Sequence, residues 1–148
     1  MTQPITLFTA GYQGATIDSF LDLLHAHGVA HLIDIRQRPQ SRKPDFGKKR
    51  LAAHLETVGI GYTHIVELGT PQQLRDEVQR THDYQAFFAA LEPVITAQTA
   101  ALDAALALIT QQPCVLLCFE ARYQECHRLT VAKVLVRRAH DQIRVVHL

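Results

Sequence analysis

Two stretches of the sequence combine the side chains that most often carry chemistry in proteins. The first is Asp34-Ile-Arg36, and the second runs from Cys118 to Arg128 with the sequence CFEARYQECHR. The second stretch holds two thiols, an imidazole, two carboxylates and two guanidinium groups. Such groups can serve as nucleophile, as general acid or base, or as ligands of an anion or a metal. They act together only if the fold brings both stretches to one place.

Cys126 and His127 lie at the expected start of a helix, in the pattern ECHRLTVAKVL. Free backbone N–H groups and the helix dipole favour negative charge at such a position, so they stabilise a thiolate and attract anions. Cys126 is therefore a candidate nucleophile with His127 as proton carrier, and Arg128 is a candidate anion ligand. Cys118 and Glu120, at the end of the preceding strand, complete the candidate catalytic group, with Glu120 as acid or base.

The same thiols allow other interpretations. Cys118, Cys126 and His127 could bind zinc, with Glu120 as a fourth ligand or as the base for a bound water, although the paired C-x-x-C spacing of structural zinc sites is absent. A disulfide between Cys118 and Cys126 would suit a redox sensor. Three cysteines are too few to crosslink a secreted scaffold, so we expect reduced thiols. Because the zinc spacing is absent, we expect no cofactor and no metal. Cys114 and Cys118 also fit a simpler role as small apolar residues of a buried strand.

Asp34 ends an apolar strand, where a buried charge costs free energy unless it is paired. Arg36, Arg42 or Arg128 could pair with it in a structural ion pair. Alternatively, Asp34 could act as a general base or orient an arginine, and we include it among the candidate catalytic residues. The candidate anion ligands are the polar residues expected near the strand ends, namely Tyr12, Arg36, Ser41, Arg42 and Arg128.

Charge is unevenly distributed along the chain. The net charge is +1, but residues 36–50 hold seven of the 15 Lys and Arg residues and a single acid, Asp45. This local excess is typical of a surface that receives phosphate, a nucleotide, nucleic acid or an acidic protein, although a solvated charged loop would look the same. If the segment binds nucleic acid, the phosphate contacts would come from Arg38, Lys43, Lys48, Lys49 and Arg50.

The hydrophobic pattern predicts the elements that must position these residues. Strands are expected at 5–9, 29–35, 60–65, 114–119 and 143–148, helices at 17–27, 48–58, 84–91, 93–109 and 125–139, and irregular structure at 69–83. This order predicts an α/β fold, a single three-layer domain over residues 1–148 with a mostly parallel five-stranded sheet and helices on both faces. Ligands of such sheets bind at the carboxyl ends of the strands, so Tyr12, Asp34 and Cys118 should meet there.

The composition is that of one globular domain, with 148 residues, 47% of them apolar and 20% charged. No run approaches the roughly 20 apolar residues of a membrane span, and the first residues lack the basic start and apolar core of a signal peptide. We therefore expect a cytoplasmic protein with no membrane partner. The Ala-rich segment 93–109 could form a contact in a homo-oligomer.

Several short motifs occur together along the chain. They are Thr9-Ala-Gly-Tyr12, Asp34-Ile-Arg36 with Pro39 and Ser41, Phe46 with Leu51 and Leu55, Gly59-Ile-Gly-Tyr62 leading to Glu67-Leu-Gly69, Tyr84 with Phe87 or Phe88, and Leu117-Cys-Phe-Glu120 with Cys126-His-Arg128. In this combination the chain resembles, nearly end to end, the bacterial and archaeal family known as domain of unknown function 488. The resemblance implies an α/β fold with a polar cluster at its strand ends, and no settled activity. Thr70 departs from the family, which commonly has a second glycine there.

Three functions remain open. The first is an enzyme that acts on a phosphorylated or otherwise anionic substrate, such as a nucleotide or nucleic acid, held by Arg36, Arg42 and Arg128. The second is a non-catalytic module that binds nucleic acid or nucleotides through residues 36–50, which leaves the Cys126-His127 pair unused. The third is a metal or redox sensor built on its cysteines, for which the sequence has no spacing motif.

Overall fold

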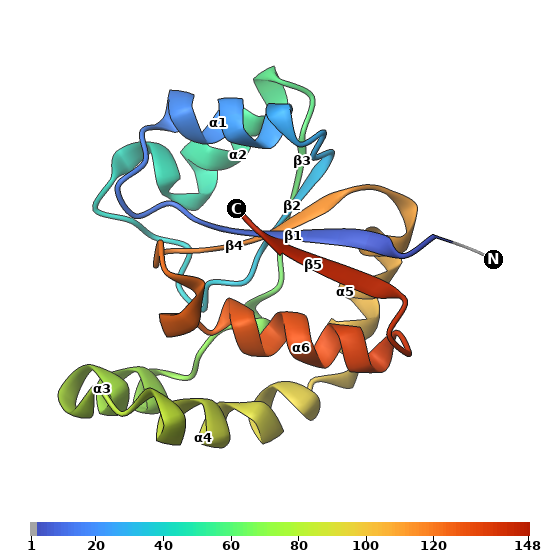
Figure 1. The fold of residues 1–148 in the computed structure, drawn as a ribbon. Helices are drawn as coiled ribbons and strands as arrows, with labels where there is room; N and C mark the ends of the chain where they lie inside the picture. The colour runs from blue at the N-terminus through green and yellow to red at the C-terminus, as the bar shows by residue number, and fades with distance from the viewer. Residues whose placement is uncertain (1–2) are drawn as a thin grey trace.

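The structure, a computed structural model, describes residues 3–148, which form five strands and six α-helices (Figure 1). The strands are β1 (Ile5–Gly11), β2 (His31–Asp34), β3 (Gly61–His64), β4 (Cys114–Cys118) and β5 (Ile143–His147). They make one sheet in the order β3-β2-β4-β1-β5, and every neighbouring pair is parallel. The predicted three-layer α/β fold is confirmed.

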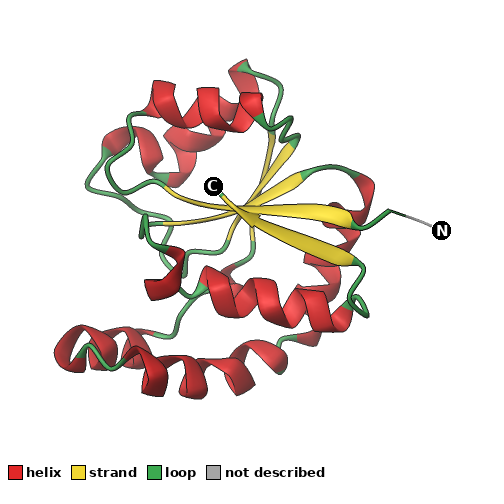
Figure 2. Ribbon diagram, in the orientation of Figure 1, coloured by secondary structure: helices red, strands yellow, loops and turns green. Residues whose placement is uncertain are grey.

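Helices cover both faces of the sheet, as Figure 2 shows with strands in yellow between helices in red. Helices α1 (Ile17–Ala26) and α2 (Lys48–Thr57) lie on one face, and α5 (Thr99–Gln111) and α6 (Arg128–Arg138) lie on the other (Figure 1). Helices α3 (Gln72–Thr81) and α4 (Tyr84–Thr96) form an additional layer, in which α4 packs against α6. Because all the strands are parallel, the connections from strands to helices all start from the same edge of the sheet.

Strand β4 lies at the centre of the sheet and is buried on both faces. Cys114 and Leu116 belong to the core under α4, α5 and α6, whereas Val115 and Leu117 belong to the core under α1 and α2. A strand covered on both sides needs apolar residues at every position, which explains why its sequence shows no alternation. Its last residue, Cys118, reaches the carboxyl edge of the sheet.

Residues 69–83 were predicted to be irregular, and this is wrong for most of them because they form α3. Of residues 72–81, all of which the structure describes, none is buried, and only Leu74 and Val78 pack against the core. Two apolar residues one helical turn apart are too short a pattern to stand out from a polar sequence. The remaining residues include Gln, Arg and Glu, whose intrinsic helix propensity favours the helix without contacts to the core.

Pro93 was predicted to begin a helix, but it lies inside α4, and the chain bends later, between Thr96 and Thr99. Proline cannot donate a hydrogen bond to the carbonyl of Ala89, and this costs little where the carbonyl can meet water. Ala89 is exposed, so water can replace the missing donor. No single helix within residues 3–148 is long and apolar enough to cross a membrane; only α4 and α5 taken together pass that test, and they are bent by 85°.

Candidate functional site

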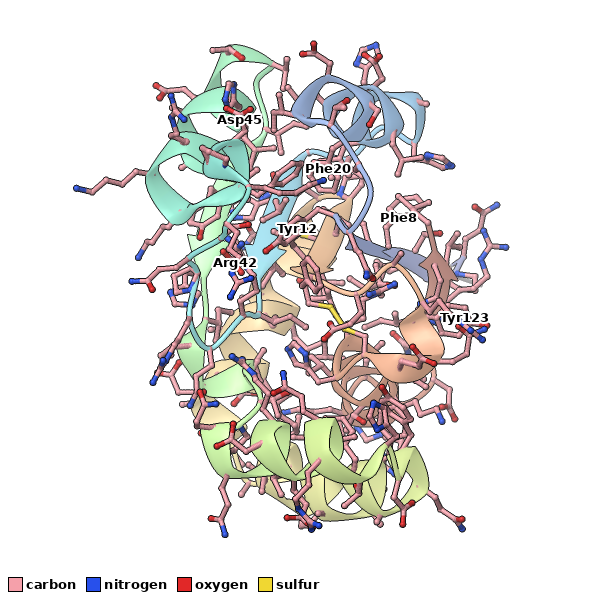
Figure 3. All side chains as sticks on the ribbon, turned by 90° about the vertical axis from the view of Figure 1, so that its left-hand side faces the viewer. Phe8, Tyr12, Phe20, Arg42, Asp45 and Tyr123 are labelled. Carbon is pink, nitrogen blue, oxygen red and sulfur yellow. A yellow bond between two sulfur atoms is a disulfide. The ribbon has the colours of Figure 1, made fainter. Side chains whose placement is uncertain are left out.

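A pocket of about 690 Å³ opens at the carboxyl edge of the sheet, where β1, β2 and β4 end. Figure 3 looks onto this edge, with the disulfide in yellow near the centre, Tyr12 and Arg42 above it and the ribbon of α3 below. The pocket is lined by most of the residues that the sequence analysis selected, namely Tyr12, Arg36, Arg38, Ser41, Arg42, Lys43, Cys118, Glu120 and His127. The structure therefore brings together side chains that are more than 100 residues apart in the sequence.

Asp34 and Arg36 form a buried ion pair at the end of β2. The Arg36 Nε donates to Asp34 Oδ1 at 2.8 Å and its Nη2 donates to Oδ2 at 2.7 Å, while the Tyr62 hydroxyl donates to Oδ2 as well. Burial alone would lower the pKa of Arg36, but the bonds and the charge of Asp34 outweigh it and raise the pKa. Asp34 is fully buried and does not line the pocket. The pair is thus a structural support of the pocket.

Arg36 also ties the basic loop to the first strand. Its Nη1 donates to the backbone carbonyl of Phe46 at 2.7 Å and to the Tyr12 hydroxyl at 3.3 Å. The rings of Tyr12 and Phe46 stack with their centres 4.6 Å apart. Because these contacts and Asp34 occupy its donors, Arg36 positions the pocket wall.

Arg128, the first residue of α6, is wholly buried and does not line the pocket. Its Nε donates to the Thr9 hydroxyl at 3.2 Å, its Nη1 to Cys118 Sγ at 3.3 Å and to the carbonyl of Glu120, and its Nη2 to the carbonyl of Ala121 at 3.1 Å. Burial lowers the pKa of Arg128 to about 10, so the guanidinium stays charged at neutral pH. Arg128 therefore holds the loop after β4 in place.

Two glycines of the motifs allow loops to approach closely. A Cβ on Gly11 would lie 1.7 Å from the carbonyl oxygen of Glu120, so any larger residue would displace the loop after β4. A Cβ on Gly69 would lie 2.5 Å from the backbone nitrogen of Gln37, in the loop after β2. Both positions require glycine, because backbone atoms of another loop occupy the space that a Cβ would take.

Cys118 and Cys126 are joined by a disulfide, which contradicts the expectation of reduced thiols. The prediction of a helix from residue 125 is also wrong at its start. A short 3-10 turn at Tyr123–Glu125 folds the chain back, and Cys126 follows it in extended backbone, 1% exposed, before α6 begins at Arg128. The turn carries Cys126 to the end of β4. The N–H of Arg128, at the start of α6, is still directed at the sulfur of Cys126. The disulfide and the burial of Cys126 are therefore what prevent it from acting as the expected thiolate nucleophile.

His127 lies between the end of β2 and the start of α6, with 8% of its surface exposed. Its Nε2 is 2.8 Å from the backbone carbonyl of Ile35, and because a carbonyl only accepts, Nε2 must carry the proton. Nδ1 then carries the lone pair and faces Cys126 Sγ at 3.8 Å. Burial lowers the pKa of His127 to about 4, so the ring is neutral at physiological pH. The two sulfurs and a ring nitrogen of His127 lie within 4.8 Å of one another, a group that could hold a metal ion.

Glu120 lines the pocket beside the disulfide. Its Oε2 lies 3.6 Å from Cys118 Sγ. Burial raises the pKa of Glu120, and the charges of Arg128 and Arg75 oppose this only in part. A carboxyl group with a raised pKa holds and releases a proton closer to neutral pH, as a general acid or base must.

The basic segment is divided by the fold. Arg38, Arg42 and Lys43 line the pocket, and Lys43 donates to the backbone carbonyls of Tyr12 and Ala15. Three other basic residues of the segment are exposed in the first turn of α2 and do not line the pocket, namely Lys48, Lys49 and Arg50. The two halves can therefore be tested separately.

Several pocket residues were missed by the sequence analysis. Arg75 comes from α3, the helix that Leu74 and Val78 pack against the core. Three aromatic residues also line the pocket, namely Tyr84, Phe87 and Phe119. Phe119 was predicted as the last residue of a buried strand, but it lies just beyond β4 and is 44% exposed.

Comparisons with known proteins identify the family. A family model described as "Domain of unknown function DUF488" matches residues 16–135, which include both Asp34-Ile-Arg36 and the stretch from Cys118 to Arg128. Searches of curated proteins and of solved structures found no match. The match covers most of the chain, and the protein therefore belongs to the DUF488 family.

Proposed function

We propose that this protein is an enzyme that acts on a phosphorylated or otherwise anionic substrate, with a nucleotide or nucleic acid as the preferred class. The observation that carries the proposal is a pocket at the strand ends that is lined by Arg38, Arg42 and Arg75 together with Glu120. The volume of about 690 Å³ is that of a pocket for a small molecule.

The charges of the pocket favour an anion. Asp34 neutralises Arg36, whereas within residues 3–148 no ion pair involves Arg38, Arg42 or Arg75. Two acids, Glu120 and Glu125, line the same pocket, so the basic side chains are in excess. A concave surface with an excess of one sign concentrates ligands of the opposite sign.

The aromatic side chains favour a ligand with a flat ring. Phe119, Tyr84 and Phe87 line the same pocket as the arginines. Aromatic rings stack on any nucleobase with little preference for its identity, while arginines bind the phosphates. A nucleotide offers both groups, which inorganic phosphate does not.

Glu120 is the residue best suited to move a proton in this pocket. Its raised pKa and its place on the wall fit a general acid or base, whereas Asp34 is held in an ion pair away from the pocket. Cys118 also lines the pocket, but its sulfur is bonded to Cys126. We therefore assign the proton transfer to Glu120, and we assign positioning roles to Asp34 and Arg36.

The test is a calorimetric titration of the protein with adenosine monophosphate. Arg42→Gln should weaken binding about 10-fold, because it removes an exposed cation from the pocket wall. Arg50→Gln is the matched control, since Arg50 is an exposed arginine of the same segment outside the pocket. Equal affinity in the wild type and Arg42→Gln would contradict the proposal.

A binding module that uses the start of α2 is the second candidate. Lys48, Lys49 and Arg50 are exposed on one helical turn, where they could contact successive phosphates. Replacing all three by Gln should then flatten the salt dependence of binding to a single-stranded oligonucleotide, while Arg42→Gln should not. The enzyme proposal predicts that Arg42→Gln weakens the binding of adenosine monophosphate and that the triple substitution leaves this binding unchanged.

A further inference from the structure

Three potential metal ligands meet beside the pocket, and a carboxylate lies next to one of them. The Sγ atoms of Cys118 and Cys126 and a ring nitrogen of His127 lie within 4.8 Å of one another, and Glu120 Oε2 lies 3.6 Å from Cys118 Sγ. Cys118, Cys126 and His127 are all buried. Cys118 and His127 also border the pocket, as does Glu120. Two sulfurs, one imidazole nitrogen and one carboxylate oxygen make a donor set that zinc accepts.

The imidazole of His127 is oriented as a metal ligand would be. It donates its Nε2 proton to the backbone carbonyl of Ile35 at 2.8 Å, the type of support that fixes the tautomer of histidines in metal sites. The Nδ1 lone pair is thereby directed at the sulfurs, and its neighbour there is Cys126 Sγ at 3.8 Å. Within residues 3–148 no nitrogen or oxygen donor makes a hydrogen bond to this Nδ1.

The backbone spacing of the cysteines suits two thiolates that share an ion. The Cα atoms of Cys118 and Cys126 lie 7.5 Å apart. Disulfides usually join Cα atoms roughly 4.4–6.8 Å apart. Two sulfurs that each lie about 2.3 Å from a tetrahedral zinc are separated by roughly 3.8 Å. Reduction followed by rotation of the two side chains therefore opens room for an ion without bringing the backbones closer.

The surrounding charges balance in the metal-bound state. Two thiolates and Zn²⁺ sum to zero, and the Glu120 carboxylate adds one negative charge that the buried guanidinium of Arg128 neutralises. Arg128 also donates to both sulfurs, through its backbone N–H to Cys126 Sγ at 3.5 Å and through Nη1 to Cys118 Sγ at 3.3 Å. Donors of this kind support thiolate ligands from the second layer around a metal.

We propose that the reduced protein binds one Zn²⁺ through Cys118, Cys126 and His127, with Glu120 as the fourth ligand. A dithiol first reduces the disulfide: the bond between Cys118 and Cys126 breaks, both cysteines become thiols, and the two sulfurs of the reductant form a cyclic disulfide. Zn²⁺ then binds both sulfurs and releases their two protons. This inference goes beyond the proposed function, which concerns the disulfide form. Glu120 is free to transfer a proton in that form, and it is a metal ligand only in the reduced form that binds Zn²⁺.

The experiment is a titration of the anaerobically reduced protein with Zn²⁺ alone, in competition with a chromophoric chelator, and with Co²⁺ alone by absorption. We expect one ion per chain and, with Co²⁺, the thiolate charge-transfer and tetrahedral ligand-field bands. Cys126→Ser and His127→Gln should each lower the affinity at least about 100-fold, since even the loss of a supporting residue costs 10–100-fold. Circular dichroism shows whether each variant is folded.

Two further variants keep the test decisive. Cys114→Ala is the matched control, because Cys114 lies on the same strand and face but outside the cluster, and it should bind Zn²⁺ as the wild type does. Glu120→Gln, on the pocket wall, should weaken binding and alter the Co²⁺ spectrum. The proposal is overturned if the reduced wild type binds no Zn²⁺, or if folded Cys126→Ser or His127→Gln binds it equally well. Adenosine monophosphate titrated into the same samples reports the proposed function separately.

Discussion

Asp34 explains at the level of single residues why motifs far apart in the sequence meet. It accepts hydrogen bonds from Arg36 and Tyr62, and Arg36 in turn reaches Tyr12 and the backbone of Phe46. A buried ion pair contributes little net stability because desolvation offsets its attraction, but removing one partner leaves an uncompensated charge. The pair therefore joins the loops after β1 and β2 to strand β3 beside the pocket.

Asp34→Asn should lower the free energy of unfolding by about 3–5 kcal/mol, because the buried Arg36 would lose its counter-charge. Urea denaturation measures the change. Asp45→Asn is the control, since Asp45 pairs with His54 on the surface and should change stability by no more than about 0.5 kcal/mol. Equal effects of the two substitutions would show that Asp34 does not have this role.

His31 gives the protein a pH-dependent stability. Burial lowers the pKa of His31 in the folded state, so below its ordinary pKa of about 6.5 the unfolded chain binds a proton more readily than the folded chain. The free energy of unfolding should therefore decrease as pH falls below that value. His31→Gln should reduce this slope, and His25→Gln, at an exposed position of α1, should leave it unchanged. An identical slope in His31→Gln and the wild type would contradict the assignment.

At the level of the elements, the strength of the hydrophobic pattern decided what could be predicted. The strands and helices α1, α2 and α5 have continuous apolar runs or faces, and their existence could be predicted. The start of α6 could not, because residues 125–127 are set by the turn after β4 and by the contacts of Arg128. Helix α3 could not either, since it has only Leu74 and Val78 as anchors.

Helix α3 should be the least protected helix in hydrogen exchange. None of residues 72–81 is buried, whereas α6, of similar length, buries six residues. Local opening therefore exposes little apolar surface in α3 and much in α6, and α3 amides should exchange at least about 100-fold faster. Mass spectrometry of exchanged peptides compares the two helices in one sample. Exchange in α3 as slow as in α6 would mean that the layer outside α6 is held by more than Leu74 and Val78.

At the level of the whole molecule, the topology could be predicted but the complete pocket could not. Parallel strands place their carboxyl ends at one edge, so Tyr12, Asp34 and Cys118 were expected together there. Tyr12 and Cys118 line the pocket, whereas Asp34 is buried and does not. The opposite wall comes from α3 and α4, whose position depends on packing against α6. Such packing involves residues distant in the sequence, so no local pattern reveals Arg75 as part of the site.

The most direct measurement is a crystal structure of the protein soaked with adenosine monophosphate. The account predicts the phosphate beside Arg38, Arg42 and Arg75 and the base against Phe119, in the pocket at the carboxyl edge of the sheet. A nucleotide bound at Lys48, Lys49 and Arg50, with the pocket filled only by solvent, would contradict it. The function would then have to be sought on the surface of α2.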